Sequence, residues 1–284
     1  THPGEFSFLV DRPYYSSTRF FAVGLTLNYA HDPLVLGVAT IDSDFQPPSP
    51  VIQHQLLGHV DIAGSFLDRV TIGLSLPITL VETGRALAGV TPSGGGSFGD
   101  PRLSVLGRVF NHADQHAFSL HLGLSAWLPL RAFTDGPPPQ SSDSGPRFLP
   151  RVVGAGAVRR VRWSASLGFL YRPTATLGAA PSDQGSRAGS EVQLGLAASY
   201  HGVLRGSPYQ LGPELLLATD VANGRAFQTD QSRLELLLGG HLHLNQQVLF
   251  GLAAGPGFLR APGTPDVRVL VRVPGDTRDH RAGM

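Results

Sequence analysis

The 284-residue chain contains no cysteine, which excludes disulfides and any thiolate site, whether nucleophilic or metal-binding. It also contains no lysine, so all 22 basic residues are arginine. Charged residues make up only 15% of the chain, against about 25% in soluble domains, and the formal net charge is +1. Nucleic-acid binding needs a clustered basic face, so we expect no nucleic-acid partner.

Long apolar runs are also missing. No stretch approaches the roughly 18 apolar residues that a membrane-spanning helix needs. Thr1 does not open a signal peptide, so if the protein is exported we expect this to be its processed form. What the chain does have is 35 glycines, 23 prolines and 42% hydrophobic residues, which favour strands and turns over helices. The composition therefore predicts an all-β fold.

The clearest pattern lies in residues 70–80. Every even position is large and apolar and every odd position is small or polar, giving an apolar face of Val70, Ile72, Leu74, Leu76, Ile78 and Leu80. A soluble strand usually has five or six residues, whereas a strand tilted across a bilayer needs about 9 to 11. We therefore predict a transmembrane β-barrel whose apolar face meets lipid. A soluble β-sandwich would show the same alternation and is the alternative.

The same alternation predicts about twelve strands. They are expected at residues 18–29, 51–63, 70–80, 101–110, 116–130, 148–158, 162–172, 190–202, 209–220, 232–244, 248–258 and 265–273. The connections alternate long and short, except for a brief last one at residues 260–264. An even strand number with short periplasmic turns and longer external loops is typical of up-and-down outer-membrane barrels. We predict an antiparallel barrel with both termini periplasmic and with residues 30–50, 81–100, 131–147 and 173–189 outside the cell.

Three segments follow from this pattern. Residues 1–17 show no clean period and are expected to be a lead-in segment tucked against or into the barrel. Residues 18–273 are the transmembrane barrel, and residues 274–284 are a polar tail or linker.

The inward faces carry the polar and charged residues, whereas mid-strand outward positions carry essentially no arginine. The candidate pore-lining residues are Arg102, Arg108, Arg162, Arg172, Arg233, Arg268, Arg272, Asp61, Glu191, Glu214, Glu235, His241 and His243, and Asp220 falls on the same face. Buried charges must be paired or hydrated. Eight strands enclose just enough room for side chains and sixteen or more leave a channel, so twelve allow both a salt-bridged interior and a pore. If the lumen conducts, its arginine excess predicts a preference for anions.

Two stretches support a family resemblance. LDRVTIGLSLPITL, followed by a Gly-rich loop and SFGDPRLSVLGRVF, resembles the N-terminal barrel of OmpA-family outer-membrane proteins of Gram-negative bacteria, in the variety larger than eight strands. The opening RFFAVGLTLNYAHDPLVLG is similar to the first strand and loop of that family. The resemblance implies an envelope anchor or slow pore, often followed by a peptidoglycan-binding domain, and it implies no catalytic residues. The last strand ends here at Val273, where such barrels commonly end in an aromatic residue.

Catalytic and metal chemistry find little support. His241 with His243, and His59 with Asp61, lie two residues apart on one face and could seed a metal site or a proton relay. Neither pair has a third ligand at recognisable spacing, so we expect lumen hydrogen bonding and no metal. The chain has no HExxH or GxSxG motif, and its Gly94–Gly96 run is expected in a flexible external loop. We expect no enzyme activity and no cofactor.

The leading functional expectation is a non-enzymatic outer-membrane barrel with a structural or partner-docking role, with or without a narrow pore. Its expected partners are outer-membrane lipid and lipopolysaccharide, and other envelope proteins or peptidoglycan through a further domain. The alternative is a dedicated porin-like channel for small, preferentially anionic solutes. Conductance that a substrate blocks would favour the channel, and co-purification with a stable envelope partner would favour docking.

Overall fold

The computed structural model describes residues 8–11, 20–36, 49–66, 69–87, 90–111, 118–129, 145–177, 186–222, 226–229, 231–245 and 247–277. Within these ranges the chain forms fifteen strands, and no helix there is long and apolar enough to cross a membrane. The strands are β1 (Phe21–Leu36), β2 (Ser49–Phe66), β3 (Val70–Gly84), β4 (Ser97–Phe98), β5 (Arg102–Asn111), β6 (Ser119–Trp127), β7 (Arg147–Val158), β8 (Val161–Leu170), β9 (Ala175–Leu177), β10 (Ser186–Ala188), β11 (Glu191–Leu204), β12 (Ser207–Asp220), β13 (Ser232–His243), β14 (Leu249–Arg260) and β15 (Val267–Asp276).

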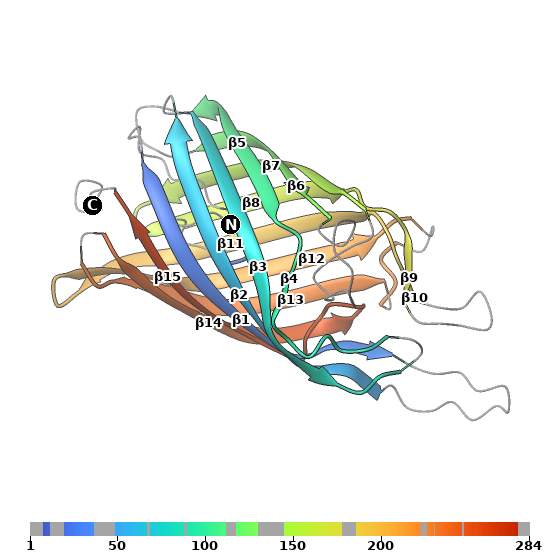
Figure 1. Ribbon diagram of the computed structural model, residues 1–284. Helices are drawn as coiled ribbons and strands as arrows, with labels where there is room; N and C mark the ends of the chain where they lie inside the picture. The colour runs from blue at the N-terminus through green and yellow to red at the C-terminus, as the bar shows by residue number, and fades with distance from the viewer. Residues whose placement is uncertain are drawn as a thin grey trace, which may run out of the picture.

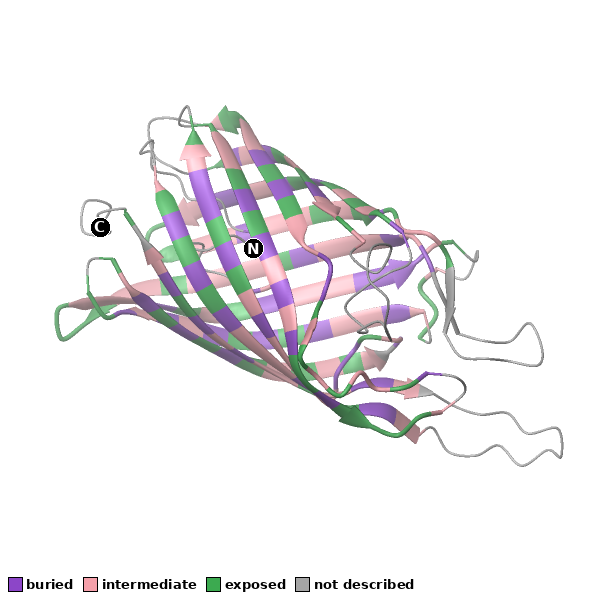
Figure 2. Ribbon diagram, viewed as in Figure 1, coloured by how far each residue is buried: buried purple, intermediate pink, exposed green. Residues whose placement is uncertain are grey.

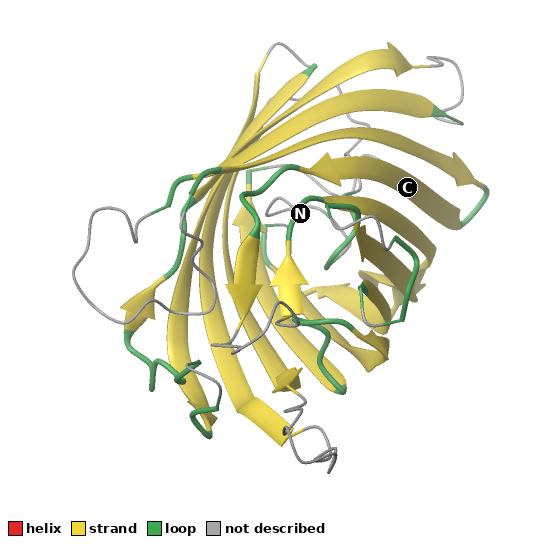
Figure 3. Cartoon of the chain, turned by 90° about the vertical axis from the view of Figure 1, so that its right-hand side faces the viewer, coloured by secondary structure: helices red, strands yellow, loops and turns green. Residues whose placement is uncertain are grey.

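Twelve of these strands close into a barrel (Figure 1). The strands β1, β2, β3, β5, β6, β7, β8, β11, β12, β13, β14 and β15 each pair antiparallel with the next, and β15 pairs back with β1, from Ala22 opposite Asp276 to His31 opposite Val267. Seen from one end, the strands form a ring (Figure 3). The prediction of an all-β, antiparallel, up-and-down barrel of twelve strands is confirmed.

The three remaining strands are short. β4 pairs with Ile78 and Thr79 of β3, beyond the point where β3 stops pairing with β5. β9 and β10 form a separate two-stranded hairpin. Both lie in segments that the sequence pattern predicts as long loops, so the prediction missed these short strands. Two- and three-residue strands are too short to show a period of two.

The burial of side chains is inverted relative to a soluble protein. On β3, Ile72 and Leu74 are 40% and 47% exposed, whereas Ser75 and Thr79 on the opposite face are 6% and 0% exposed. Figure 2 shows the same alternation of exposed and buried positions along the other barrel strands. A soluble β-sandwich would bury its large apolar residues, so this pattern excludes that alternative. The chain is a transmembrane β-barrel with a lipid-facing apolar surface.

The two ends of the barrel differ in their connections. Residues 67–69, 112–118, 159–160, 205–206 and 244–248 join strands at one end, which we call the short-connection end. Residues 37–48, 85–101, 128–146, 171–190, 221–231 and 261–266 join strands at the other, the long-connection end. β1 starts and β15 finishes at the short-connection end, where the Phe21 N–H donates to Thr277 Oγ1 at 3.0 Å. The predicted alternation of long and short connections is therefore present, with residues 261–266 as its brief exception.

Strand lengths depart from the prediction on one side of the barrel. β1, β2 and β3 have 16, 18 and 15 residues, so residues 30–36 and 81–84, expected in external loops, are strand. These extensions persist because the three strands continue to pair with one another past the long-connection end. In contrast, β6 covers only residues 119–127 of the predicted 116–130. β15 continues to Asp276 because β1 pairs with it as far as Ala22.

The alternation in residues 51–63 predicts one outward apolar face of Ile52, Leu56, Val60 and Ile62, and for Ile52 that prediction is wrong. Its side chain is 1% exposed and packs with Leu34, Val51 and Val90. The register of β2 against β3 shifts between Ile52 and His54, and such a shift turns the following side chains to the other face. The result is a small apolar cluster that ties residues near Val90 to the extension of β1 and β2.

Candidate functional site

The inward faces of the barrel strands form a polar wall around the lumen. Buried polar side chains on these strands include Thr26, Asp61, Ser75, Ser104, His121, Ser125, Arg151, Ser164, Glu191, Gln210, Glu214, Glu235, His241, His243 and Arg272. Their positions follow from the alternation of a strand: once Leu234 and Leu236 of β13 face lipid, Glu235 between them must face the lumen. The lipid requirement on one face thus decides which residues build the interior.

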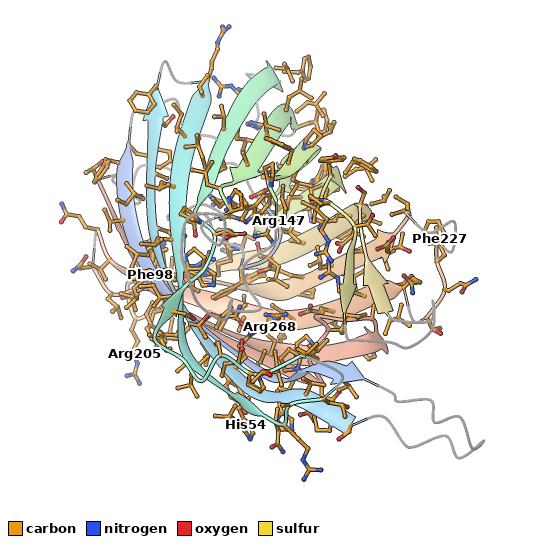
Figure 4. All side chains as sticks on the ribbon, turned by 45° about the vertical axis from the view of Figure 1, so that its right-hand side comes forward. His54, Phe98, Arg147, Arg205, Phe227 and Arg268 are labelled. Atoms are coloured by element: carbon orange, nitrogen blue, oxygen red, sulfur yellow. The ribbon has the colours of Figure 1, made fainter. Side chains whose placement is uncertain are left out.

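Arg268 links three strands inside the barrel (Figure 4). Its Nε donates to Glu235 Oε2 at 2.6 Å, and its Nη2 donates to Glu235 Oε1 at 3.1 Å. Its Nη1 donates to Asn28 Oδ1 at 3.0 Å. A two-point contact of guanidinium and carboxylate is the strong, oriented form of this ion pair. It ties β15 to β13 across β14, and to β1.

A second group of charges lies toward the long-connection end. Glu191 at the start of β11 pairs with Arg233 of β13, and its Oε1 lies 3.8 Å from Nη1 of Arg172. Asp100 accepts a hydrogen bond from Arg147 Nη2 at 3.1 Å. The guanidinium of Arg147, which Figure 4 shows inside the barrel, also lies 5.2 Å from the centre of the Trp127 ring. These buried charges are paired, as groups removed from water must be.

Residues 8–11 lie inside the lumen, and we call them the lumen strap. The backbone N–H groups of Phe8, Leu9 and Val10 donate to the two carboxylate oxygens of Glu214 on β12, at 2.6, 2.8 and 3.0 Å respectively. Three N–H donors converging on one buried carboxylate satisfy both its oxygens. Residues 8–11 belong to the predicted lead-in segment of residues 1–17, and these four residues are bound to the inner wall of the barrel.

The ring of Phe8 occupies a fitted place on the wall. It stacks on His241 with ring centres 4.4 Å apart and an interplanar angle of 19°, and the Arg272 guanidinium lies 5.2 Å from its centre. Nη2 of Arg272 also donates to the Phe8 carbonyl at 3.3 Å. Glycines make this space, because a Cβ added at Gly239 or Gly251 would come within 2.9 Å of the ring. Phe8 is accordingly 4% exposed.

The other end of the strap contacts β7 and β11. Asp11 forms an ion pair with Arg151, its Oδ2 lying 2.5 Å from Nε, and Arg151 Nη1 donates to Ser125 Oγ at 2.6 Å. A Cβ added at Gly195 of β11 would lie 3.1 Å from a methyl of Val10. The strap therefore reaches along the inside of the barrel from β15 to β7.

The described residues of the lumen line two cavities beside the strap. The first, of about 220 Å³, is lined by Phe8, Leu9, Thr26, Asn28, His59, Asp61, Ser75, Pro77, Asp100, Arg102, Trp127, Leu270 and Arg272. The second, of about 180 Å³, is lined by Leu9, Asp11, Arg102, Trp127, Arg147, Leu149, Arg151, Ser166, Gly168, Leu170, Gln193, Gly195 and Leu216. Leu9, Arg102 and Trp127 line both, so these three side chains mark the junction of the two cavities.

The structure brings some of the predicted pore-lining residues together. Glu191 meets Arg172 and Arg233, and Glu235 meets Arg268. Thr26 joins two others, because its hydroxyl donates to Asp61 at 3.4 Å and accepts from Arg272 Nε at 3.1 Å. Of the remaining positions, Arg102 lies at the cavity junction, Glu214 on β12 and His241 on β13 contact the strap, and His243 is buried on β13.

Two predicted residues lie apart from this group. Arg108 pairs across strands with His121 just before the connection of residues 112–118. Arg162 follows the turn of residues 159–160 and pairs across strands with Ser199. Both therefore lie at the short-connection end, away from the cavities and the strap. Asp220, at the end of β12, instead accepts hydrogen bonds from the N–H groups of Gly189 and Ala222.

Sequence reasoning missed several residues that build the interior. Arg151 lies on β7, and the residues that follow it on this strand are only Val, Gly and Ala. The sequence of β7 therefore does not show which of its residues face the lumen. Three others lie at or beyond strand ends: Asp100, Arg147 and Asp11. There the alternation of a strand does not predict which way a side chain points. The available signal for Arg151 was its odd spacing from the outward positions, three residues from Phe148 and one residue from each of Pro150 and Val152. Phe8 had no signal at all, because its place depends on residues far along the chain.

The described residues give no support for a metal site in the barrel. Among the described residues, no group of three or more His, Asp or Glu side chains lies close enough together to hold a metal ion. His241 stacks on Phe8, and His59 lines the first cavity with Asp61. The His pairs of the sequence are therefore parts of the lumen wall.

Comparison with known proteins agrees with the fold. No protein-family model matches the chain, and neither does any curated protein sequence. The COG4313 outer membrane channel from Pseudomonas putida F1 is similar over 94% of this chain and 99% of its own, with a TM-score of 0.65 and 13% identity. The NanC porin is similar over 89% of this chain and 97% of its own, with a TM-score of 0.56 and 8% identity. The chain thus has the fold of outer-membrane β-barrels.

Proposed function

We propose that the protein is a non-enzymatic outer-membrane barrel with a structural or partner-docking role and a narrow pore. The observation that carries the proposal is the state of the lumen. Ion pairs line its wall and residues 8–11 lie inside it. Cavities of about 220 and 180 Å³ lie beside these described residues. The two solved structures of similar fold are described as a channel and a porin, which supports a passage of some kind.

The orientation we propose places the short-connection end in the periplasm. Outer-membrane barrels have short periplasmic turns and longer external loops. Since β1 starts and β15 ends at the short-connection end, both ends of the barrel would then face the periplasm. The extended parts of β1, β2 and β3 would project outside the cell. The apolar outer surface would contact lipid and lipopolysaccharide.

The sequence resemblance supports a finer proposal. Residues 67–80 and 97–110, with the opening stretch, are the basis for assigning the barrel to the OmpA family. That assignment would add an anchoring role, with peptidoglycan or another envelope protein as partner. Crosslinking in intact envelopes, followed by identification of the crosslinked species, tests it.

A porin-like channel for small anionic solutes is the second candidate, and one observation favours it. Arg102 lies at the junction of the two cavities, with Leu9 and Trp127. A positive side chain that lines a passage attracts anions and repels cations.

Conductance in planar bilayers tests both candidates. We expect the inserted barrel to give small, discrete steps, with a reversal potential in a salt gradient that indicates anion preference. Arg102→Gln should reduce that preference. Arg205→Gln, in an exposed turn outside the lumen (Figure 4), is the matched control and should leave it unchanged.

Three outcomes are informative. Steps as large as those of wide porins would contradict a narrow pore. Equal selectivity in the wild type and the Arg102→Gln variant would remove the anion-channel candidate. Verified insertion without any steps would leave only the structural or docking role.

A further inference from the structure

We propose that the lumen strap is a releasable latch: residues 8–11 bind a peptide site on the inner wall centred on Glu214, and their release widens the passage. This inference rests on the proposed pore. It concerns a binding site for a segment of the chain itself, which no pattern in the sequence assigns.

The wall site is built for an extended peptide. Glu214 receives three consecutive backbone N–H groups, whereas Glu191, Glu235 and Asp100 pair with arginine side chains. A carboxylate that accepts backbone N–H groups recognises the peptide main chain. The same donors could be satisfied by water in a hydrated lumen, so the hydrogen bonds can be exchanged.

The side chains of the strap set its resting position. The Phe8 ring packs against Leu237, Ala253 and Leu270, in addition to its stacking on His241. Burial of an aromatic ring favours the bound state. The strap is therefore expected to be bound most of the time and released in a minor fraction of molecules.

Release of the strap would join the two cavities. Leu9 lines both of them, and Asp11 lines the second. With the strap displaced, only Arg102 and Trp127 of the shared lining would remain between them. The passage would then include the space that the strap now occupies between Arg272 of β15 and Arg151 of β7.

A disulfide that fixes the strap tests the inference directly. The chain has no cysteine of its own, so a new pair reacts alone. Val10→Cys with Gly195→Cys suits this purpose, because a Cβ at position 195 would lie 3.1 and 3.2 Å from the two methyl carbons of Val10. Ser166→Ala is included in the background, since the Ser166 hydroxyl would lie 2.6 Å from that Cβ.

We expect the open probability of the disulfide-linked variant to be at least about tenfold lower than that of the same variant after reduction. Each single-cysteine variant, treated identically, is the control. Equal conductance of the oxidised and reduced forms would overturn the latch.

A second variant loosens the strap. Glu214→Gln replaces the charged acceptor by an amide and should raise the open probability about ten- to a hundredfold. Its matched control is Glu82→Gln, at a buried carboxylate on β3 that accepts the Ser93 N–H at 2.8 Å and does not contact the strap. Phe8→Ala, which leaves the wall intact, should act in the same direction as Glu214→Gln.

A labelling readout separates the latch from the pore. In a Val10→Cys variant, a water-soluble maleimide should react about tenfold faster or more when Glu214→Gln is added. Unchanged labelling would overturn the latch even if the barrel conducts. Faster labelling with no conductance in any variant would support the latch and show that the proposed pore is wrong.

Discussion

Replacing Arg268 by glutamine shows whether the lumen wall is dry or hydrated. The guanidinium and carboxylate of Arg268 and Glu235 are joined at 2.6 and 3.1 Å, and their side chains are 15% and 7% exposed. Removing one partner of a buried pair costs about 3 to 5 kcal/mol, whereas an exposed pair contributes about 0.2 to 1 kcal/mol. We expect Arg268→Gln to lower the free energy of unfolding by about 3 kcal/mol, because the wall holds Glu235 away from water.

The double variant completes a double-mutant cycle, because it also removes the carboxylate that Arg268→Gln leaves unpaired. With Glu235→Gln added, two neutral amides face each other and most of the stability should return. The coupling between the two positions should then be about 2 kcal/mol or more. Arg160→Gln is the control, since its hydrogen bond to the Tyr200 hydroxyl at 3.1 Å lies on the exposed surface. It should leave the free energy of unfolding unchanged within the error of the measurement.

Equilibrium unfolding in denaturant, followed by the fluorescence of Trp127 and Trp163, provides these free energies. The barrel is refolded into detergent or vesicles, and only variants with an unchanged denaturant slope are compared. A coupling below about 0.5 kcal/mol would refute the reasoning, because it is the value of a solvated pair. The lumen would then be water-filled around Arg268.

Two further perturbations test the outer surface and the long-connection end. Leu74→Arg on the lipid face should lower the free energy of unfolding by about 2 to 4 kcal/mol. Leu204→Arg, beside a short turn, should lower it by about 1 kcal/mol or less. Equal losses of stability in the two variants would contradict the position of Leu74 in the hydrocarbon. Gly95→Ala should detach residues 94–99 from β3 and speed hydrogen exchange there, because φ is +126° and the new Cβ would lie 2.5 Å from the Leu80 carbonyl oxygen. Gly94→Ala meets no atom within 4 Å and should have a smaller effect, so equal exchange rates would contradict this reasoning.

The barrel itself could be predicted from the sequence because lipid imposes a simple rule on each strand. From Ile72 to Leu80 every second side chain had to be apolar, and the structure places those side chains outward. The same rule fixes the inward direction of Glu235 and Arg268. It fails on β7, where Val153 and Ala155 are buried inside although they resemble the outward residues. Where both faces of a strand are apolar, the sequence does not show which residues face lipid and which face the lumen.

The strap could not be predicted for a different reason. Phe8 meets Glu214 across 206 positions of sequence, and its ring meets His241 farther along still. A four-residue segment held by such contacts shows no period and has no propensity of its own. The extension of β1 to Leu36 was missed likewise, because pairing with β2 stabilises it and no lipid is there to impose alternation.

The number of strands explains why this barrel has room for such a segment. Eight strands leave an interior that side chains alone can fill, and sixteen leave an open channel. With twelve, ion pairs such as Arg268 with Glu235 join strands that lie two apart, but they follow the wall and do not reach across the lumen. Among the described residues, one extended segment lies in the remaining space, and Glu214 supplies the acceptor that its N–H groups require. A barrel of this size can therefore change between a filled and a more open lumen by moving one segment, without altering the pairing of any strand.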